Sequence, residues 1–399
     1  MAVNLPLVKR PPLMEKDKPA FHKHVCPPSF GGDNPDPLFP DVVIKRNLLV
    51  GIDHDVLGPT GETLMTVPMW IIEDPDAPDA ERRTFPSRII RIPQDSLTHA
   101  RVGCQGNTHT IHWHGIEPTP MNDGVGKHSF EVAGPFVYQF QPRQAGTFFY
   151  HCHKNTTLHF EMGLYGFLIV DPPPHPDSGL TAPYVTGGPG FAEVFNPNPD
   201  PLLNNFIKYD VEALWAADDM DSRWHELGHN AFMQKCDKDD PINPANFETG
   251  FLHDFRQDVF SLSGISRVKG DERPITVNEI PPASAPPGTV ALAAPTVGVG
   301  QTLYVRFLAA GYSIQRLTIT GLNAMIVAGD GHPFGVPPFG TYSKPVFLPA
   351  GTPLDLTTAR RNDLVIKPTV PGVYPVTIQF FHTVSLALLQ TMTTFITVV

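Results

Sequence analysis

Residues 109–114 read HTIHWH and residues 150–164 read YHCHKNTTLHFEMGL, and these two stretches decide how the chain folds. Together they hold six of its histidines and one of its cysteines. Side chains alternate between the two faces of a β-strand, so residues two apart share a face. If both stretches form strands, His109 and Cys152 face one side, and the histidines that flank Trp113 and Cys152 face the other.

His109 and Cys152, which share one side of the expected strands, indicate a blue-copper site. His159, seven residues after Cys152, adds a second imidazole, and two imidazoles with one thiolate are the trigonal ligand set of such sites. Met162 and Leu164 are the candidates for the weak axial position. A zinc site rarely needs one cysteine flanked by histidines, so we favour copper.

The opposite side of the strands holds a second group of four histidines. They are the pairs on either side of Trp113 and Cys152, namely His112, His114, His151 and His153. One peptide step on each side of Cys152 separates this group from the first. The two stretches therefore predict two neighbouring metal sites on opposite faces of the same strands.

Short apolar runs bounded by Gly, Pro, Asn or Asp continue outward from these stretches. These short runs, together with 45 Pro and 33 Gly, predict an all-β chain. The apolar fraction of 41% is enough to form hydrophobic cores. We expect a Pro-rich extended arm over 1–40, a β-sandwich domain over 41–172 and a second over 203–399. A Pro- and Gly-rich linker is expected over 173–202.

The net charge, the N-terminal residues and the cysteines limit the possible binding partners, cellular location and disulfides. The net charge of −11 argues against a nucleic-acid partner, and no stretch is apolar enough to span a membrane. Residues 1–19 lack the apolar region of a signal peptide, and we expect a periplasmic or secreted protein whose signal has been removed. Cys26, Cys104 and Cys236 allow at most one disulfide, and its pairing stays open.

The two stretches resemble the signature of the multicopper oxidase family, whose domains have the cupredoxin fold, a Greek-key β-sandwich. The resemblance covers most of 41–172, including NDGVGKHSFEVAGPFVYQFQPRQAGTFFYHCH between the motifs. Residues 203–399 resemble more weakly the family's domains that lack type 1 copper. The resemblance implies a copper-dependent oxidoreductase of laccase type. Such an enzyme takes single electrons from a small molecule, a metal ion or a redox protein, and reduces dioxygen.

The resemblance assigns roles to the first group of ligands residue by residue. His109, Cys152 and His159 match the ligands of type 1 copper. Leu164, five residues after His159, matches the axial position, and Met162 in the same turn is the alternative. Because leucine does not coordinate, the resemblance implies a raised reduction potential.

The resemblance also assigns the second group. His112, His114, His151 and His153 match ligands of type 2 and type 3 coppers, and Cys152 would carry electrons between the two sites. A complete cluster in this family takes two further H-x-H pairs from another domain. Residues 203–399 contain no such pair, so what completes this site stays open.

Three interpretations follow from the missing pairs. In the first, the chain forms an oligomer, with a trimer favoured, and the second domain of a neighbouring copy or the arm with His22 and His24 completes an oxygen-reducing cluster. In the second, the chain is similar to copper nitrite reductases, with one type 2 copper held by His114, His151 and His382 of the partner subunit. In the third, the protein is a non-catalytic blue-copper electron carrier or a copper-binding protein.

The remaining polar candidates are weaker. Single histidines elsewhere are predicted to lie at the surface or in solvent: His22, His24, His225, His229 and His332. His253 receives no role, and neither does Glu161, which lies beside the first group. We expect six aspartates to be solvated loop carboxylates, with the attraction of cations as the alternative: Asp218, Asp219, Asp221, Asp237, Asp239 and Asp240.

Overall fold

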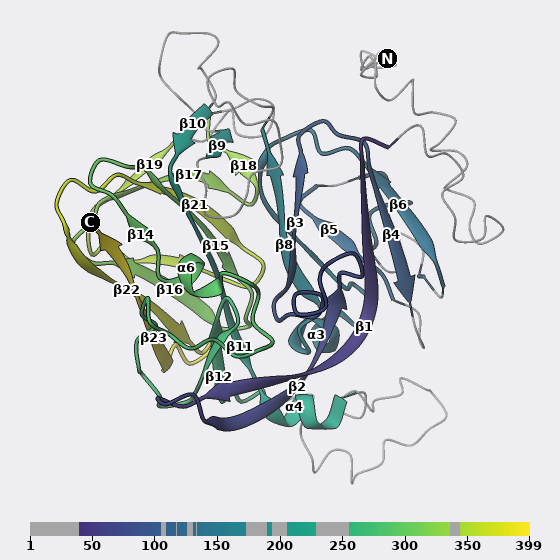
Figure 1. The fold of residues 1–399 in the computed structure, drawn as a ribbon, viewed down its shortest axis with the longest axis horizontal. Coiled ribbons are helices and arrows are strands. Elements are labelled where there is room, and N and C mark those ends of the chain that lie inside the picture. Colours follow the sequence, from purple (N-terminus) through teal and green to yellow (C-terminus); the bar gives the residue numbers. More distant parts are fainter. Residues whose placement is uncertain are drawn as a thin grey trace, which may run out of the picture.

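The chain folds into two β-sandwiches that lie side by side (Figure 1). The computed structural model describes residues 40–104, 109–116, 118–125, 131–132, 134–172, 190–193, 206–228, 255–335 and 344–399. Within these ranges strands dominate and the few helices are short, so the predicted all-β class is confirmed. None of the described helices is long and apolar enough to cross a bilayer. The predicted arm lies almost entirely outside the described residues.

The described residues of the first sandwich form two four-stranded sheets and one short helix. Its elements are β1 (Val42–Leu57), β2 (Thr63–Glu73), β3 (Ser87–Pro93), β4 (Thr98–Cys104), β5 (His112–His114), β6 (Phe136–Phe140), β7 (Gly146–His151), α3 (Thr156–Glu161) and β8 (Tyr165–Asp171). One sheet has the order β2-β1-β4-β6 and the other β3-β8-β7-β5. The pairs β1–β4 and β3–β8 are parallel, and the other neighbours are antiparallel.

The second sandwich has a larger and a smaller sheet. Its elements are β11 (Val211–Met220), α4 (Ser222–Leu227), β12 (Val259–Leu262), β13 (Ile265–Val268), α6 (Thr289–Ala293), β14 (Thr296–Val297), β15 (Leu303–Ala309), β16 (Ile314–Ile319), β17 (Ala324–Gly329), β18 (His332–Pro333), β19 (Val346–Leu348), β20 (Leu354–Leu356), β21 (Arg361–Ile366), β22 (Gly372–Phe381) and β23 (Leu388–Val398). The larger sheet has the order β13-β12-β11-β15-β21-β17-β18, with β19 also on β17, and the smaller has β14-β23-β22-β16-β20. The parallel pairs β11–β15 and β14–β23 repeat those of the first sandwich.

The segment predicted as a linker contains a short strand. Within 173–202 the structure describes β9 (Gly190–Glu193), which pairs antiparallel with β10 (Phe206–Tyr209). This two-stranded ribbon stands apart from both sandwiches in its hydrogen bonding.

Strands β7 and β8 are buried on both faces because each separates two cores. Their side chains alternate as the pleat requires. Phe148, Tyr150, Leu168 and Val170 lie in the core of the first sandwich. Phe149, Tyr165, Phe167 and Ile169 lie in a core shared with residues of the second sandwich such as Leu214 and Leu308. The two sandwiches are therefore joined by continuous apolar packing.

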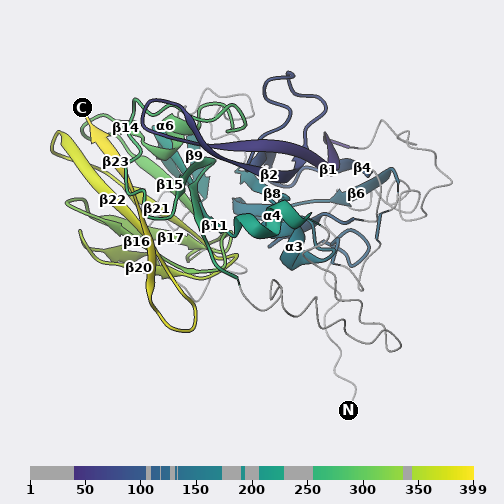
Figure 2. The same ribbon diagram turned by 90° about the horizontal axis from the view of Figure 1, so that it is seen from below.

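A second connection comes from β1 and β2, which run from the first sandwich across to the second (Figures 1 and 2). His54 on β1 is fully buried there. Its Nδ1 lies 2.8 Å from Oγ of Ser284 and its Nε2 2.8 Å from Oγ of Ser266. A neutral imidazole donates from one ring nitrogen and accepts at the other, so it satisfies both hydroxyls.

The burial of His54 predicts a pH-dependent stability. Burial lowers the pKa of His54 to about 4, against about 6.5 for an unfolded histidine. The unfolded chain therefore binds the extra proton, and stability present above pH 6.5 is lost as the pH falls toward 4. For the copper-free protein we expect a loss of about 2.5 kcal/mol between pH 7.5 and 4.5 from this residue. Urea unfolding at the two pH values measures it, and parallel losses in wild type and His54→Gln would contradict the assignment.

Candidate metal centres

Three buried side chains meet at the end of β7. Sγ of Cys152 lies 3.2 Å from Nδ1 of His159 and 3.6 Å from Nδ1 of His109, and these donor atoms form one compact group. Transition metals bind imidazole at roughly 2.0–2.1 Å and thiolate at roughly 2.3 Å, so donors in a trigonal plane stand about 3.5–4 Å apart. The observed separations agree within about half an ångström, and the donor set fits copper.

Backbone hydrogen bonds fix each of these ligands. His109 and Val132 exchange a pair of bonds, N to O, of 2.9 and 2.7 Å. The amide of Cys152 donates to the carbonyl of Leu164 at 3.0 Å, and the amide of Leu164 donates to the carbonyl of His159 at 3.0 Å. His159 lies on the short helix α3. A helical turn thus occupies the long spacing between Cys152 and His159.

The two axial candidates lie in different cores. Leu164 belongs to the core that contains Cys152. Met162 packs instead with Leu158 and Trp224, and its carbonyl accepts a hydrogen bond from the amide of Trp70 at 2.7 Å. This placement supports Leu164 as the residue in the axial position.

Exchanging the two candidates separates them experimentally. Leu164→Met adds a thioether beside the thiolate and is expected to lower the reduction potential by at least about 60 mV, a tenfold change in relative affinity for the two oxidation states. Met162→Leu, a swap of similar volume, should leave the potential unchanged. Redox titration of the blue absorbance measures both. A shift in Met162→Leu alone would assign the axial role to Met162.

The second group of histidines lies beside the first. His112 and His114 belong to β5 and His151 ends β7, whereas His153 follows that strand. Donor atoms of His112, His114 and His151 lie within 4.8 Å of one another. Nδ1 of His114 is 3.2 Å from Nε2 of His151, and both rings stack on Phe149, with centroids 4.3 and 5.1 Å away. The His153 ring lies 5.3 Å from that of His112. Strand alternation thus brings all four predicted residues to one place.

Two backbone carbonyls set the tautomers in this group. Nδ1 of His112 lies 2.8 Å from the carbonyl oxygen of Asp123, and Nδ1 of His151 lies 2.9 Å from that of Cys152. A carbonyl only accepts, so Nδ1 carries the proton in both rings. The lone pair is then on Nε2, as a metal ligand requires.

Burial also keeps this group in its ligand form. Desolvation lowers the pKa of His114 to about 2 and that of His151 to about 3, and the nearby positive charge of Arg361 acts in the same direction. Desolvation lowers the pKa of His153 as well. Because the neutral imidazole is the form that binds metal, these side chains are ready to coordinate without first losing a proton.

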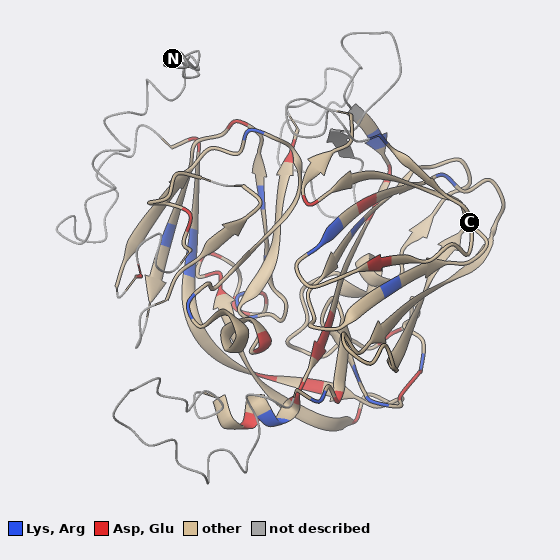
Figure 3. Ribbon diagram, turned by 180° about the vertical axis from the view of Figure 1, so that it is seen from behind, with Lys and Arg blue, Asp and Glu red and all other residues tan. Residues whose placement is uncertain are grey.

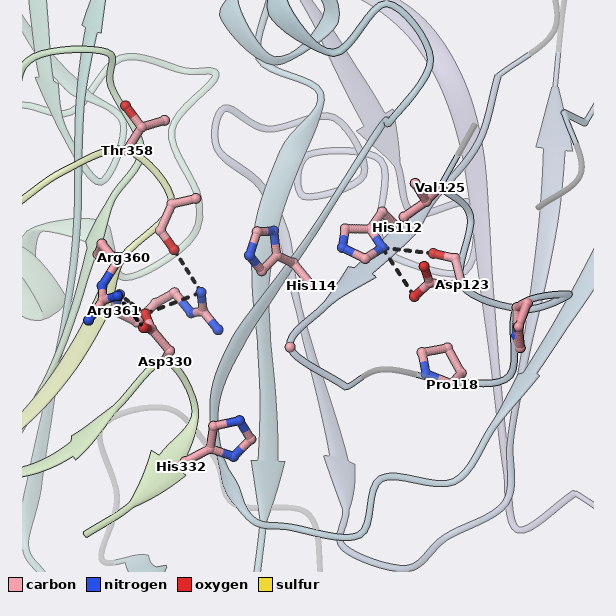
Figure 4. A pocket seen from close by; sticks show the side chains of 13 residues that line it. His112, His114, Pro118, Asp123, Val125, Asp330, His332, Thr358, Arg360 and Arg361 are labelled. Atoms are coloured by element: carbon pink, nitrogen blue, oxygen red, sulfur yellow. Dashed lines mark hydrogen bonds and ion pairs between the residues drawn. The ribbon is translucent and has the colours of Figure 1, made fainter. Parts of the chain in front are cut away.

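A cavity of about 830 Å³ opens beside the second group, between the two sandwiches. Figure 4 shows His112 and His114 on one wall, with His332, Arg360 and Arg361 of the same chain on the other. Among the described residues, the second sandwich therefore faces these histidines with two guanidinium groups, the carboxylate of Asp330 and one imidazole.

Three single histidines take positions that the sequence did not indicate. His332 was expected at the surface, but it is half-buried in the cavity wall, and its Nδ1 lies 2.8 Å from Oε1 of Gln144. The surface prediction for His225 is wrong, because its ring is buried and its Nδ1 lies 2.8 Å from the carbonyl of Pro68. Nδ1 of His382 accepts hydrogen bonds from the turn that follows β22, so a role in a partner subunit stays a prediction.

The expectation of solvated aspartates is wrong for the three that the structure describes. Asp218 and Asp219 lie on β11 and Asp221 caps α4, and all three are buried. The hydroxyl of Tyr165 donates to Asp218 at 2.7 Å, and the amide of Asp221 donates to Glu161 at 2.8 Å. Burial raises the pKa of Glu161 and of Asp218 well above the usual range. The strand continues into the domain interface where a loop was expected.

Several predicted positions lie outside the described residues and receive no structural account. They are His22, His24, Cys26, His229, Cys236, Asp237, Asp239, Asp240 and His253.

Sequence comparisons place the two histidine-rich stretches in a known family. The profile of a family described as multicopper oxidase matches residues 98–175. Copper resistance protein A of Pseudomonas syringae pv. tomato is 36% identical over 91 residues, 22% of this chain and 15% of the relative. An L-ascorbate oxidase of Cucumis sativus is 47% identical over 96 residues, 22% of this chain and 16% of the relative. The matched segment thus spans less than a fifth of these relatives.

Structural comparisons extend the likeness of fold to both sandwiches. The blue copper oxidase of Nitrosomonas europaea has a TM-score of 0.55 and 18% identity, over 90% of this chain and 86% of that one. The multicopper oxidase Fet3p has a TM-score of 0.56 and 14% identity, over 90% of this chain and 52% of that one. The fold of both sandwiches is therefore that of these oxidases, the cupredoxin fold.

Proposed function

We propose that this chain, which belongs to the multicopper oxidase family, is a copper-dependent oxidoreductase of laccase type. It oxidises a small-molecule or metal-ion reductant, or a redox protein, in one-electron steps and reduces dioxygen. Copper, when bound, supplies the redox chemistry at both centres. The type 1 centre is built on His109, Cys152 and His159, and the second, of type 2 and/or type 3, on His112, His114, His151 and His153.

One observation carries this proposal, namely that adjacent residues belong to different centres. Cys152 lies in the first group and His151 in the second, and Nδ1 of His151 also lies 2.9 Å from the carbonyl of Cys152. A covalent and a hydrogen-bonded connection therefore join the two ligand sets. An electron entering at one group has a short bonded path to the other.

In the reaction, the protein itself fixes the orientation of both ligand sets and excludes water from them. Phe149 stacks on His114 and His151 and belongs to the shared core of the two sandwiches. Carbonyls of Asp123 and Cys152 fix the ring orientations. Such outer partners typically contribute about 10- to 100-fold to metal affinity or activity.

We also propose a homotrimer and a periplasmic or secreted location. His153 is half-buried, so a partner subunit can approach the second group from that side. His112 and His114 face the chain's own second sandwich instead. His382→Gln tests whether a partner supplies a ligand, because it should then lower the copper content without affecting the blue absorbance. Light scattering measures the oligomeric state, and cell fractionation locates the protein.

A second candidate function is the one-electron reduction of a small oxyanion such as nitrite. The observation that favours it is the tight grouping of three histidines, His112, His114 and His151, which suits a single copper. Conversion of nitrite to nitric oxide with a chemical reductant tests this alternative.

The decisive experiment counts copper and follows dioxygen. We expect more than one copper per chain, a blue and a non-blue signal by electron paramagnetic resonance, and oxygen uptake with a phenolic or metal-ion donor. Nitric oxide formation without oxygen uptake would favour the second candidate. One copper per chain and no turnover would overturn both and leave an electron carrier or a copper-binding protein.

A further inference from the structure

Arg361, at the start of β21, is a buried cation in the wall of the cavity. The residue is 2% exposed, and its guanidinium lies over the ring of Phe149 at 5.2 Å from the centroid. His114 stacks on the same ring. Figure 4 shows the Arg361 guanidinium on the wall opposite His114. A positive charge from the second sandwich is thus held against the histidines of the first.

The charge of Arg361 is only partly compensated by the protein. Its Nη1 donates to the carbonyl of Ala359 at 2.7 Å and lies 3.5 Å from Oδ1 of Asp330. The same carboxylate also pairs with Arg360 at 3.1 Å. Asp363 acts on Arg361 as well, but it lies 3.8 Å from Arg306, so each of these two carboxylates is shared with another arginine. Nε of Arg361 is buried and has no hydrogen-bond partner among the residues that the structure describes. Burial accordingly lowers the pKa of Arg361 to about 10.

Gly115 keeps the path from Arg361 to the histidines open. It follows His114 directly, its φ is +92°, and a Cβ there would stand 2.7 Å from Nη2 of Arg361. Any larger residue would displace the guanidinium. The remaining carboxylate of the cavity, Asp123, lies beside His112, with Oδ1 3.4 Å from Nδ1, and does not neutralise Arg361.

We propose that Arg361 binds a small planar oxyanion, of the nitrite or carboxylate class, in the cavity beside His112 and His114. A guanidinium presents parallel N–H donors that match two oxygens of such an anion. Anions are favoured here because Arg361 lacks a full counter-charge and because a metal at the histidines adds positive charge. The inference rests on the proposed second copper centre and names the class of ligand that reaches it.

The test is a titration of the copper-loaded protein with nitrite, followed by calorimetry and by the non-blue paramagnetic signal. Arg361→Gln is expected to raise the dissociation constant at least about tenfold, the loss typical of a charge-assisted contact. Arg361→Lys keeps the charge without the paired donors, so we expect at least about threefold. Arg360→Gln is the matched control, because its exposed charge pairs with the same Asp330, and its dissociation constant should stay within about threefold of wild type.

The outcomes separate this inference from the proposed function. Nitrite affinity in Arg361→Gln within threefold of wild type overturns the inference, and so does an equal loss in Arg360→Gln. If Arg361→Gln loses its blue absorbance, the nitrite affinity of Arg361→Lys is measured instead. An unchanged nitrite affinity in Arg361→Lys also overturns the inference. Copper is counted in the same samples. Absence of the second copper in wild type contradicts the proposed function, whereas loss of nitrite affinity with both coppers present concerns Arg361 alone.

Discussion

Cys152→Ser is expected to abolish the blue absorbance and to lower reductant turnover at least about 100-fold. The thiolate is the ligand that distinguishes this centre, and losing a mere outer-shell partner already costs up to about 100-fold. In the copper-free protein, burial raises the pKa of Cys152 to about 11. Metal binding therefore releases the proton of this thiol. A serine hydroxyl keeps its proton at neutral pH and cannot replace the thiolate.

The copper content of this variant makes the prediction specific. The second group is unaltered, so Cys152→Ser should lose one copper per chain and keep its non-blue signal. Cys104→Ser is the matched control, because Cys104 belongs to neither group. Electron paramagnetic resonance with metal analysis provides the measurement. A Cys152→Ser protein that remains blue would remove the type 1 assignment altogether.

Glu212→Gln is expected to destabilise the protein by about 3–5 kcal/mol, the cost of leaving buried charges without their partner. Both oxygens of Glu212 lie 2.7 Å from Nη2 of Arg91, and Oε1 lies 2.7 Å from Nε of Arg306. Burial alone would raise the pKa of Glu212, but the two arginines outweigh it and lower the pKa to about 2. Figure 3 shows basic and acidic positions on strands that face each other between the sandwiches.

The effect on unfolding should exceed that of an exposed pair by several-fold. Arg91 belongs to the first sandwich and Glu212 to the second, so this network crosses the domain interface. Asp355→Asn breaks the partly exposed pair with Arg316, whose Nε lies 2.7 Å from Oδ1, and should cost less than about 1 kcal/mol. Urea unfolding of the copper-free proteins compares the two. Equal losses would mean that the buried network contributes no more than a surface ion pair.

The part of the site that the sequence predicts depends on the strand pleat. Period-two alternation alone separates Cys152 from His151 and His153, and in the structure Cys152 and His151 belong to different ligand groups. The same rule explains why Phe149 faces the shared core while Phe148 does not. These relations are local, because they involve residues within a few positions of one another.

The part that the sequence misses depends on contacts between distant segments. His114 and Arg361 are 247 positions apart, and no local pattern indicates that they line one cavity. His225 and Asp218 look like solvated residues because polar side chains usually are. They are buried because α4 and the end of β11 pack against the first sandwich. The packing of the two sandwiches against each other is what makes such residues neighbours.

The shared apolar core also governs how the protein is made on the ribosome. Tyr165, Phe167 and Ile169 on β8 are covered by residues such as Leu214 and Leu308, which are synthesised later. At about 5–20 residues per second, this sheet face of the nascent chain stays uncovered for several seconds or longer. During this time the first sandwich exposes an apolar surface that chaperones can bind. The cavity wall that Arg361 supplies forms last, because this residue is synthesised 247 positions after His114.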